Sequence, residues 1–444
     1  MKGALFTYVL AYGGAFVALF NPFIGVLVYV AFGVLKPELL WSWSLSGGGR
    51  FSLIVAAALC LGWLFKGFGS WQFGAARPIV AAFLGFWVWS MLSAAAAPNQ
   101  HAAWTFVSGM WKIVLPFVVG LTLIESVKQV KQLAWVLMLV QGYLALEFNL
   151  SYYSGFNVVQ HHGFGGMDNN TVAISMVTSA GLALFLGLGA DRWWHTALAF
   201  VAAVLMIHVV LFSFSRGGML AALVLGLVSF VIIPKRPRYT VIFALAALLA
   251  IRLAGPEVRA RFATAFVDER QLDFSAQSRV ELWRICWDLM REHPLLGVGP
   301  EHFGLVVHEY GWPSGKEAHT LWLQTGAELG FPGLLFLLTF YAACIVRLWP
   351  LTRRRDGLDP WFGHAARMVI AALMGFAISA QFVTVEGVEL PYYVTLIGAG
   401  VLKLASAPAP SAPPETHEDP ATRSEHGIAQ ILRGDTASRG ENRS

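Results

Sequence analysis

The chain of 444 residues is 57% hydrophobic, and only 13% of its residues are Asp, Glu, Lys or Arg. A typical soluble domain has about 45–50% apolar and about 25% charged residues. Too few polar side chains are present to cover water-soluble domains of this length, which excludes a soluble globular enzyme. The net charge of +5 comes from short basic clusters between apolar runs. Without a basic stripe on a polar domain, nucleic acid is not expected as a partner.

Apolar runs recur between short polar breaks, and most approach the about 20 residues that a helix needs to cross the hydrocarbon layer. They cover residues 4–20, 23–35, 51–65, 78–92, 106–124, 133–150, 171–188, 194–212, 217–233, 240–253, 321–346, 365–382 and 392–404. The pattern predicts an all-α polytopic membrane protein with 12 or 13 spans. The count depends on the first two runs, which are short and divided by Asn21 and Pro22. No convincing cleavage site follows the first run, so we expect a retained helix.

Composition and loop length predict four parts of the chain. Residues 1–253 hold the first ten transmembrane helices, 254–319 an external loop with surface helices, and 320–405 the C-terminal transmembrane helices. Residues 406–444 begin SAPAPSAPPETHEDPATRSEHG, which is rich in Pro and Ala with alternating charge and almost nothing to bury. Such a composition predicts a disordered tail.

The basic residues of the short loops predict the orientation in the membrane, because Lys and Arg near helix ends stay on the cytoplasmic side. Counted alternately, one set of loops holds little beyond Lys36 and Arg50. The other set holds Lys66, Arg77, Lys128, Lys131, Arg192, Lys235, Arg236, Arg238, Arg347, Arg353, Arg354, Arg355 and Arg367. The tail is therefore expected in the cytoplasm and the loop 254–319 outside. The arginines of that loop do not contradict this, because loops beyond about 60 residues escape the rule.

The first candidate functional residue on the external side is Arg216, in the segment Ser215-Arg216-Gly217-Gly218 at the end of an apolar run. An arginine is costly in lipid, so it is expected to face a polar cavity or a partner anion. The flanking glycines would let the backbone approach a ligand closely. The structural alternative is an interfacial arginine whose side chain extends to the headgroups.

The second candidate is Arg279, in a segment that matches the S-x-x-E capping box from Ser278 to Glu281. Apolar residues follow at helical spacing, which predicts an amphipathic helix on the outer membrane surface that begins at Ser278. Its free amides would add to the guanidinium of Arg279 and make a phosphate site. The alternative is a common helix cap with a solvated arginine.

The third candidate is His319, which lies where the long loop returns to the membrane, between Ala318 and Thr320. Its ordinary pKa near ~6.5 would let the imidazole take a proton from a hydroxyl at neutral pH. The structural alternative is a histidine held only by packing, which is the commoner case. Glu328 is about 180° round an ideal helix from His319, so we expect it to serve packing or the helix end without orienting His319 directly.

Two further positions could contact a substrate on the same face. Lys112 lies inside an apolar run and could touch an anionic headgroup, although extending outward to water is at least as plausible. Asp168, Asn169 and Asn170 form a turn before a helix predicted at Thr171. They could hydrogen-bond sugar hydroxyls or simply cap that helix.

We expect no metal or other cofactor. Cys60, Cys286 and Cys344 have neither metal-ligand nor paired spacing, and His161-His162 lacks further ligands. No D-x-D pair is found on the external side, which disfavours metal-dependent glycosyl transfer.

Three segments together resemble the O-antigen ligase and polymerase superfamily, bacterial membrane proteins that handle glycans on a polyprenyl diphosphate carrier. They are SRGGML around Arg216, SRVELWRICWDLMREHPLLGVGPEHFG from Ser278, and AHTLWLQTGAELGFPGLL from Ala318. With the long outer loop between them, the resemblance covers roughly residues 171–348. The segment NPFIGVLVYVAFGVLKPELLWSWSL also resembles the exosortase-associated O-glycosylation ligase branch.

The resemblance implies a glycosyltransferase-C-like fold of about twelve transmembrane helices, with an external helical loop over an outward-facing cavity. It implies that Arg216 and Arg279 bind the carrier diphosphate and that His319 is the essential histidine. The family commonly has Asn or Ser after this histidine, whereas this chain has Thr320. This departure weakens assignment to any one subfamily.

The combined expectation is a metal-independent, inverting glycosyltransferase of the bacterial inner membrane, with its active site facing the periplasm. It would move a glycan from a polyprenyl diphosphate to a hydroxyl of lipid A core or of a protein, and so act in lipopolysaccharide or other cell-envelope polysaccharide biosynthesis. One alternative is a polymerase of carrier-linked repeat units. Another is a transporter of the lipid-linked glycan, which ranks lower because no internal repeat or midplane polar site is seen.

Overall fold

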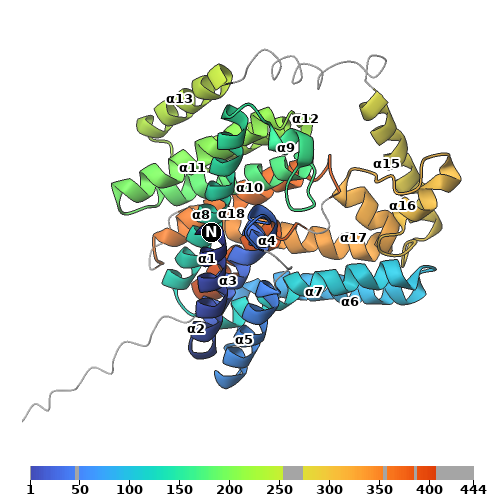
Figure 1. Cartoon of the computed structure of the whole chain (residues 1–444), viewed down its shortest axis with the longest axis horizontal. Helices are drawn as coiled ribbons and strands as arrows, with labels where there is room; N and C mark the ends of the chain where they lie inside the picture. The colour runs from blue at the N-terminus through green and yellow to red at the C-terminus, as the bar shows by residue number, and fades with distance from the viewer. Residues whose placement is uncertain (1, 46–49, 254–273, 354–357, 385–387, 407–444) are drawn as a thin grey trace, which may run out of the picture. The chain divides into compact units, whose positions relative to one another are not determined.

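The computed structural model describes residues 2–45, 50–253, 274–353, 358–384 and 388–406. Throughout these ranges the regular elements are helices, as predicted (Figure 1). The predicted tail beyond 406 and the first part of the external loop lie outside the described residues. The elements are α1 (Lys2–Tyr8), the π-helical turn η1 (Val9–Gly13), α2 (Gly14–Phe20), α3 (Pro22–Leu35), α4 (Pro37–Leu40), α5 (Phe51–Phe65), η2 (Gly74–Ala76), α6 (Arg77–Ala96), α7 (Gln100–Leu123), α8 (Val127–Tyr153), α9 (Val158–His162), α10 (Asn169–Leu188), α11 (Trp193–Phe212), α12 (Arg216–Ile232), α13 (Pro237–Leu253), α15 (Phe274–Glu292), α16 (Phe303–Val306), η5 (Val307–Tyr310), α17 (Leu321–Leu348), η6 (Trp349–Thr352), α18 (Trp361–Ser379) and α19 (Leu390–Ala405).

The helices are apolar enough to form a membrane domain. Within the described residues, eight helical segments are long and apolar enough to cross a membrane. Four shorter helices, α3, α5, α12 and α19, are also apolar. The protein is therefore a polytopic membrane protein, which confirms the prediction from hydropathy.

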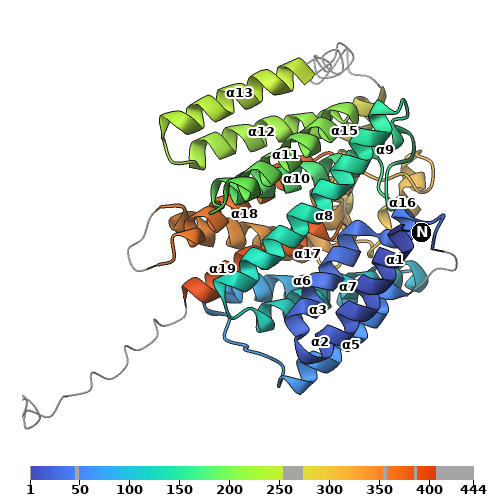
Figure 2. The ribbon, with the colours of Figure 1, turned by 60° about the vertical axis from the view of Figure 1, so that its left-hand side comes forward.

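Helix α10 lies in the interior of the bundle, between α11 and α12 on one side and α18 on the other (Figure 2). It is apolar around its whole circumference, as expected of a helix without a solvent-facing side. Its buried Thr178 hydroxyl donates to the carbonyl of Ile174 (2.8 Å) and so needs no outside partner. A Cβ atom at Gly181 would lie 3.0 Å from the backbone nitrogen of Ala372, so a small residue lets α18 approach closely.

One end of the bundle, called the site end below, brings together the turn before α7, the external loop and the starts of α10, α12 and α17. There the N–H of Asn99 donates to Nε2 of His302 (2.9 Å), and the N–H of Leu321 donates to the carbonyl of Ala380 (2.8 Å). These bonds tie the loop residues to helix ends that are far apart in the sequence.

The opposite end carries Arg367, one of the short-loop basic residues that predicted the cytoplasmic side. Its Nε donates to the carbonyl of Ile232 (3.0 Å). Lys403, near the end of α19, donates its ammonium to the carbonyl of Leu121 (2.7 Å). Which end faces the cytoplasm stays a prediction.

Helix α17 is kinked near the site end, where α6 runs beside it (Figure 1). The kink is at Gly330, with φ 69° and ψ −176°. Trp89 of α6 donates its indole N–H to the carbonyl of Leu329 (3.0 Å), and the N–H of Phe331 donates to the carbonyl of Pro294 (2.9 Å). The polar groups freed by the kink therefore have partners from α6 and from the segment after α15, as buried backbone groups require.

Replacing Gly330 with Ala is expected to destabilise the protein by about 2 kcal/mol or more, because this backbone conformation is essentially restricted to glycine. A Cβ atom there would also lie 2.3 Å from the carbonyl oxygen of Leu295. Thermal unfolding in detergent measures the effect. Gly226→Ala in α12 is the matched control, because its Cβ atom would have no neighbour within 4 Å. Equal unfolding temperatures for the two variants would contradict the prediction.

Candidate active site

Arg216 is the first residue of α12, and the motif around it forms the start of that helix. The Ser215 side chain caps the helix by accepting a hydrogen bond from the N–H of Gly218 (3.1 Å). Arg216 is half-buried. It belongs to the first turn of α12, at the positive end of the helix dipole. A guanidinium and free helix amides at one place together favour an anionic group.

The start of α10 lies beside the start of α12. Asp168 caps α10 by accepting from the N–H of Thr171 (2.8 Å), which is one of the two roles expected for it. The predicted helix start at Thr171 was wrong, because this cap lets the helix begin at Asn169. The Asn169 side chain donates to the carbonyl of Ser213 (2.8 Å), which joins this turn to the one before α12. Two helix N-termini thus meet at the site end, and the predicted binding residues Asp168 and Asn169 lie there.

The prediction that α15 begins at Ser278 was wrong. The helix begins at Phe274, so Ser278 is within it and Arg279 is not at its N-terminus. Ala276 and Gln277 favour helix and extend it upstream, and an S-x-x-E pattern can occur inside a helix as well as at its cap. The expected phosphate site from free N-terminal amides at Arg279 is therefore absent, and only the side chain of Arg279 can contribute.

Trp283, one turn after Arg279, links α15 to the segment that carries His319. Its indole N–H donates to the carbonyl of Ala318 (3.0 Å). Its ring packs at 6.4 Å from the ring of Phe382, and Phe382 also packs against Gly217, where a Cβ atom would come within 2.8 Å. The three sequence motifs therefore converge at the site end around Phe382.

His319 has a left-handed backbone conformation, with φ 52°, and a half-buried side chain. Such a conformation is uncommon for a residue with a Cβ atom and has to be held by its surroundings. Ala318, the residue before it, is held at both of its backbone polar groups. Its N–H donates to the side chain of Gln324 (3.0 Å), and its carbonyl accepts from the indole of Trp283.

Electrostatic interactions link His319 to two other predicted site residues, Arg279 and Asp168. Burial, followed by the positive charges of Arg279 and Lys316, lowers the pKa of His319 to about 4, while the Asp168 carboxylate acts in the opposite direction. The imidazole is therefore neutral at pH 7 and can accept a proton. Burial alone would raise the pKa of Asp168, but hydrogen bonds from Thr171 and Asn170 outweigh it and lower that pKa, so Asp168 is ionised.

Lys112 lies apart from this group, in a second polar cluster. It is exposed midway along α7, where its carbonyl accepts from the hydroxyl of Tyr29 (3.1 Å). Its charge acts on Glu389 and on Lys36. Lys36 in turn donates to the carbonyl of Gly165 (2.8 Å), in the turn before α10. The described contacts of Lys112 are thus with this cluster rather than with His319.

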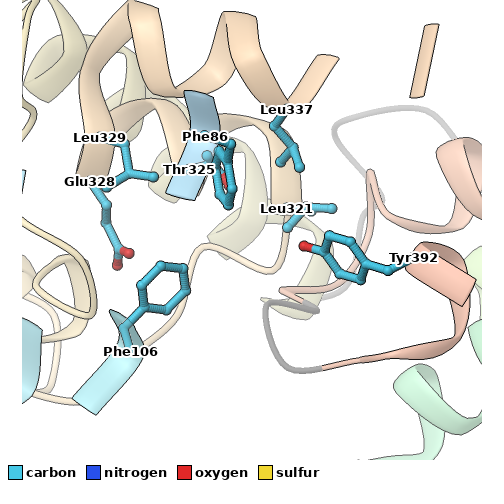
Figure 3. Close-up of a pocket in the computed structure, with 8 residues that line it drawn as sticks. All are labelled: Phe86, Phe106, Leu321, Thr325, Glu328, Leu329, Leu337 and Tyr392. Atoms are coloured by element: carbon cyan, nitrogen blue, oxygen red, sulfur yellow. The ribbon is translucent and has the colours of Figure 1, made fainter. Parts of the chain in front are cut away.

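Glu328 is buried on the first turns of α17, where sequence reasoning assigned it a packing role. It borders a cavity of about 10 Å³, close to the smallest that can hold one water molecule. In Figure 3 its carboxylate points toward Phe106 of α7, and Tyr392 lies at the far end of the lining. The carboxylate accepts hydrogen bonds from the N–H groups of Glu301 (2.9 Å) and Phe303 (3.1 Å).

Sequence reasoning missed Trp283 and Gln324, which fix the peptide beside His319. A signal for each was present in the spacing. Trp283 is four residues after Arg279, and Gln324 is four residues before Glu328 inside an apolar helix. Residues four apart share one face of a helix, so each pair could have been placed together.

Comparisons with known families divide the chain in two. Residues 201–338 match the family model described as O-Antigen ligase. Residues 1–187 match a family of unknown function (DUF5935). No curated protein matches the chain.

The first match contains Arg216, Arg279, His319 and Glu328, and the second contains Asp168, Asn169 and Lys112. The site end is thus built from both matched regions. O-antigen ligases and their relatives handle lipid-linked glycans, and a multi-pass membrane domain with a clustered polar end fits that general activity. Residues 201–338 therefore match the O-antigen ligase family, which supports the resemblance of this part of the chain to the O-antigen ligase and polymerase superfamily.

Proposed function

We propose that the protein transfers a glycan from a polyprenyl diphosphate carrier to a hydroxyl of an acceptor, lipid A core or a protein. The reaction takes place at the site end, on the periplasmic face of the bacterial inner membrane. The observation that carries the proposal is the electrostatic group of His319, Arg279 and Asp168, with the start of α12 at Arg216 beside it. The O-antigen ligase match over residues 201–338 supports the reaction class.

The two arginines serve the leaving group. Guanidinium groups donate paired hydrogen bonds to phosphate oxygens and stay charged at any working pH. As the bond between the anomeric carbon and the phosphate oxygen breaks, the diphosphate leaves with the bonding electron pair. Arg216 and Arg279 stabilise that developing negative charge, which is where preorganised electrostatics lowers a barrier most. Asn169 and the turn around it hydrogen-bond sugar hydroxyls, and Lys112 holds a lipid phosphate at the second cluster.

His319 serves the acceptor. The acceptor oxygen attacks the anomeric carbon, forms the new glycosidic bond and gives its proton to the neutral imidazole. The imidazolium that results is stabilised by the nearby carboxylate of Asp168, whose charge acts on His319. A single displacement inverts the anomeric configuration, and no covalent intermediate on a carboxylate is required.

The acceptor decides between ligation and polymerisation, and both use the same residues. Purified protein is mixed with carrier-linked glycan and, in separate reactions, lipid A core, a protein acceptor or more carrier-linked glycan. Release of polyprenyl diphosphate with one added block is expected for a ligase, whereas a ladder of products would assign a polymerase. Protein that releases no polyprenyl diphosphate with any acceptor would refute the proposal. Arg216→Ala, which lacks one of the two guanidinium groups, is the control and is expected to release polyprenyl diphosphate much more slowly.

A further inference from the structure

The buried carboxylate of Glu328 does more than fill space in α17. It is 2% exposed, and a buried carboxylate is costly unless hydrogen bonds compensate it. Three donors reach it, which are the N–H groups of Glu301 and Phe303 and, at 3.3 Å, the side-chain amide of Gln324. A leucine or methionine would pack against the same apolar neighbours, so packing alone does not account for an acid here.

The bond from Gln324 to Glu328 decides which way the Gln324 amide points. Because its Nε2 donates to Glu328, its Oε1 faces the other way, where it accepts from the N–H of Ala318 (3.0 Å) and from the hydroxyl of Thr384 (2.9 Å). An amide without this constraint could turn over and present a donor to the N–H of Ala318. Glu328 thus sets the acceptor that holds the residue before His319.

We propose that Glu328 and Gln324 are positioning residues for His319, and that they fix its peptide and the returning external loop against α17. This rests on the proposed function, because the positioned imidazole is the group that takes the acceptor proton. The chain of contacts runs from the loop amides of Glu301 and Phe303, through Glu328 and Gln324, to Ala318. It holds His319 in its left-handed conformation, which would otherwise relax at the cost of the alignment that proton transfer needs.

Glu328→Gln tests the positioning role because it keeps the volume of the side chain and replaces one acceptor oxygen with an amide donor. The new amide faces the three donors with one oxygen instead of two. The kcat is expected to fall about 10–100-fold, the range that a misplaced reacting group costs, with an unchanged KM for the donor. Glu309→Gln is the matched control, because that side chain is exposed on the same loop. A packing role predicts activity like wild type in both variants.

The double variant Gln324→Glu with Glu328→Gln tests the order of the contacts. The carboxylate at 324 can again accept from the N–H of Ala318 and from the amide at 328, which restores the tie to His319. Most of the lost kcat is therefore expected to return. A double variant as slow as Glu328→Gln would overturn the relay through Gln324.

The pH dependence gives a readout that a packing role would not change. The groups that act on His319 are Arg279 of α15, Lys316 of the external loop and Asp168 at the start of α10. Transfer needs the neutral imidazole, so the rate of the wild type falls on the acid side only near the lowered pKa, about 4. When the peptide is released into water, that pKa is expected to rise toward ~6.5, and the acid limb moves up with it. An acid limb that stays in place in Glu328→Gln would overturn the proposal.

Modification of His319 by diethyl pyrocarbonate, followed across pH by peptide mass spectrometry, reports the same titration without any glycan. A wild type that transfers no glycan, but whose His319 titration shifts in Glu328→Gln, would refute the proposed function and leave the positioning role standing. If the wild type transfers glycan but the His319 titration is the same in Glu328→Gln, the positioning role is refuted and the proposed function stands. If Glu328→Gln does not fold, Gln324→Met leaves the Glu328 carboxylate in place and removes the amide that accepts from Ala318 and Thr384. An unshifted His319 titration in that variant overturns the proposal.

Discussion

His319→Asn is expected to lower kcat for glycan transfer by about 10²–10⁴-fold, the contribution typical of a positioned general base. Asparagine is the informative substitution because it tolerates the left-handed conformation of this position, with φ 52°, better than alanine does. The loss therefore reports the imidazole and not the backbone. Because the proton moves only in the transition state, kcat and kcat/KM should fall together.

The measurement is single-turnover release of polyprenyl diphosphate from carrier-linked glycan, with thermal unfolding of the same samples. His308→Asn is the control, because His308 is an exposed histidine of the same external loop. Undiminished transfer by His319→Asn, at an unfolding temperature like that of the wild type, would exclude proton transfer by this residue.

The parts of this structure that follow from local sequence were predictable. An apolar run near 20 residues is sufficient reason for a membrane helix, and the runs around α10, α11 and α17 became helices. The cap at Asp168 could also be predicted as one of two roles, because an Asp three residues before the capped N–H needs no distant partner. Arg216 at the start of α12 follows the same logic through the cap at Ser215.

The parts that depend on distant partners were not predictable in the same way. The capping-box pattern at Ser278 has the same letters whether a helix begins there or four residues earlier, so the start of α15 was misplaced. Residues 321–346 were expected as one apolar run, whereas the helix is kinked at Gly330, where Trp89 and the carbonyl of Pro294 bind the freed backbone groups. The contact of Trp89 with Leu329 joins the two matched regions of the chain.

Glu328 shows the same limit within the candidate site. The helical angle of about 180° from His319 assumed that both residues lie in one helix, whereas α17 begins at Leu321 and His319 has a left-handed backbone. The indirect path exists only because the loop folds back so that Ala318 meets the Gln324 side chain. A one-dimensional pattern gives the angle between two helix positions, but it does not give the return path of a long loop.

Arg279→Lys is expected to lower kcat/KM by about 10-fold and Arg279→Gln by about 100-fold, because a charged hydrogen bond contributes about 1.5–3 kcal/mol and each 1.36 kcal/mol is a factor of ten. Lysine keeps the positive charge but loses the planar pair of donors that fits two phosphate oxygens. The graded loss would identify a diphosphate-binding fork, whereas equal losses would mean that charge plays no part.

Arg284→Lys is the matched control for this series, because Arg284 is exposed on the same helix, five residues further on. Combining Arg279→Gln with Arg216→Ala then tests whether both arginines act on one leaving group. Two groups that stabilise the same charge are coupled, so the double variant should lose less than the product of the single losses. Strictly multiplicative losses would mean that the two arginines act independently, and they would refute the prediction that both bind one diphosphate.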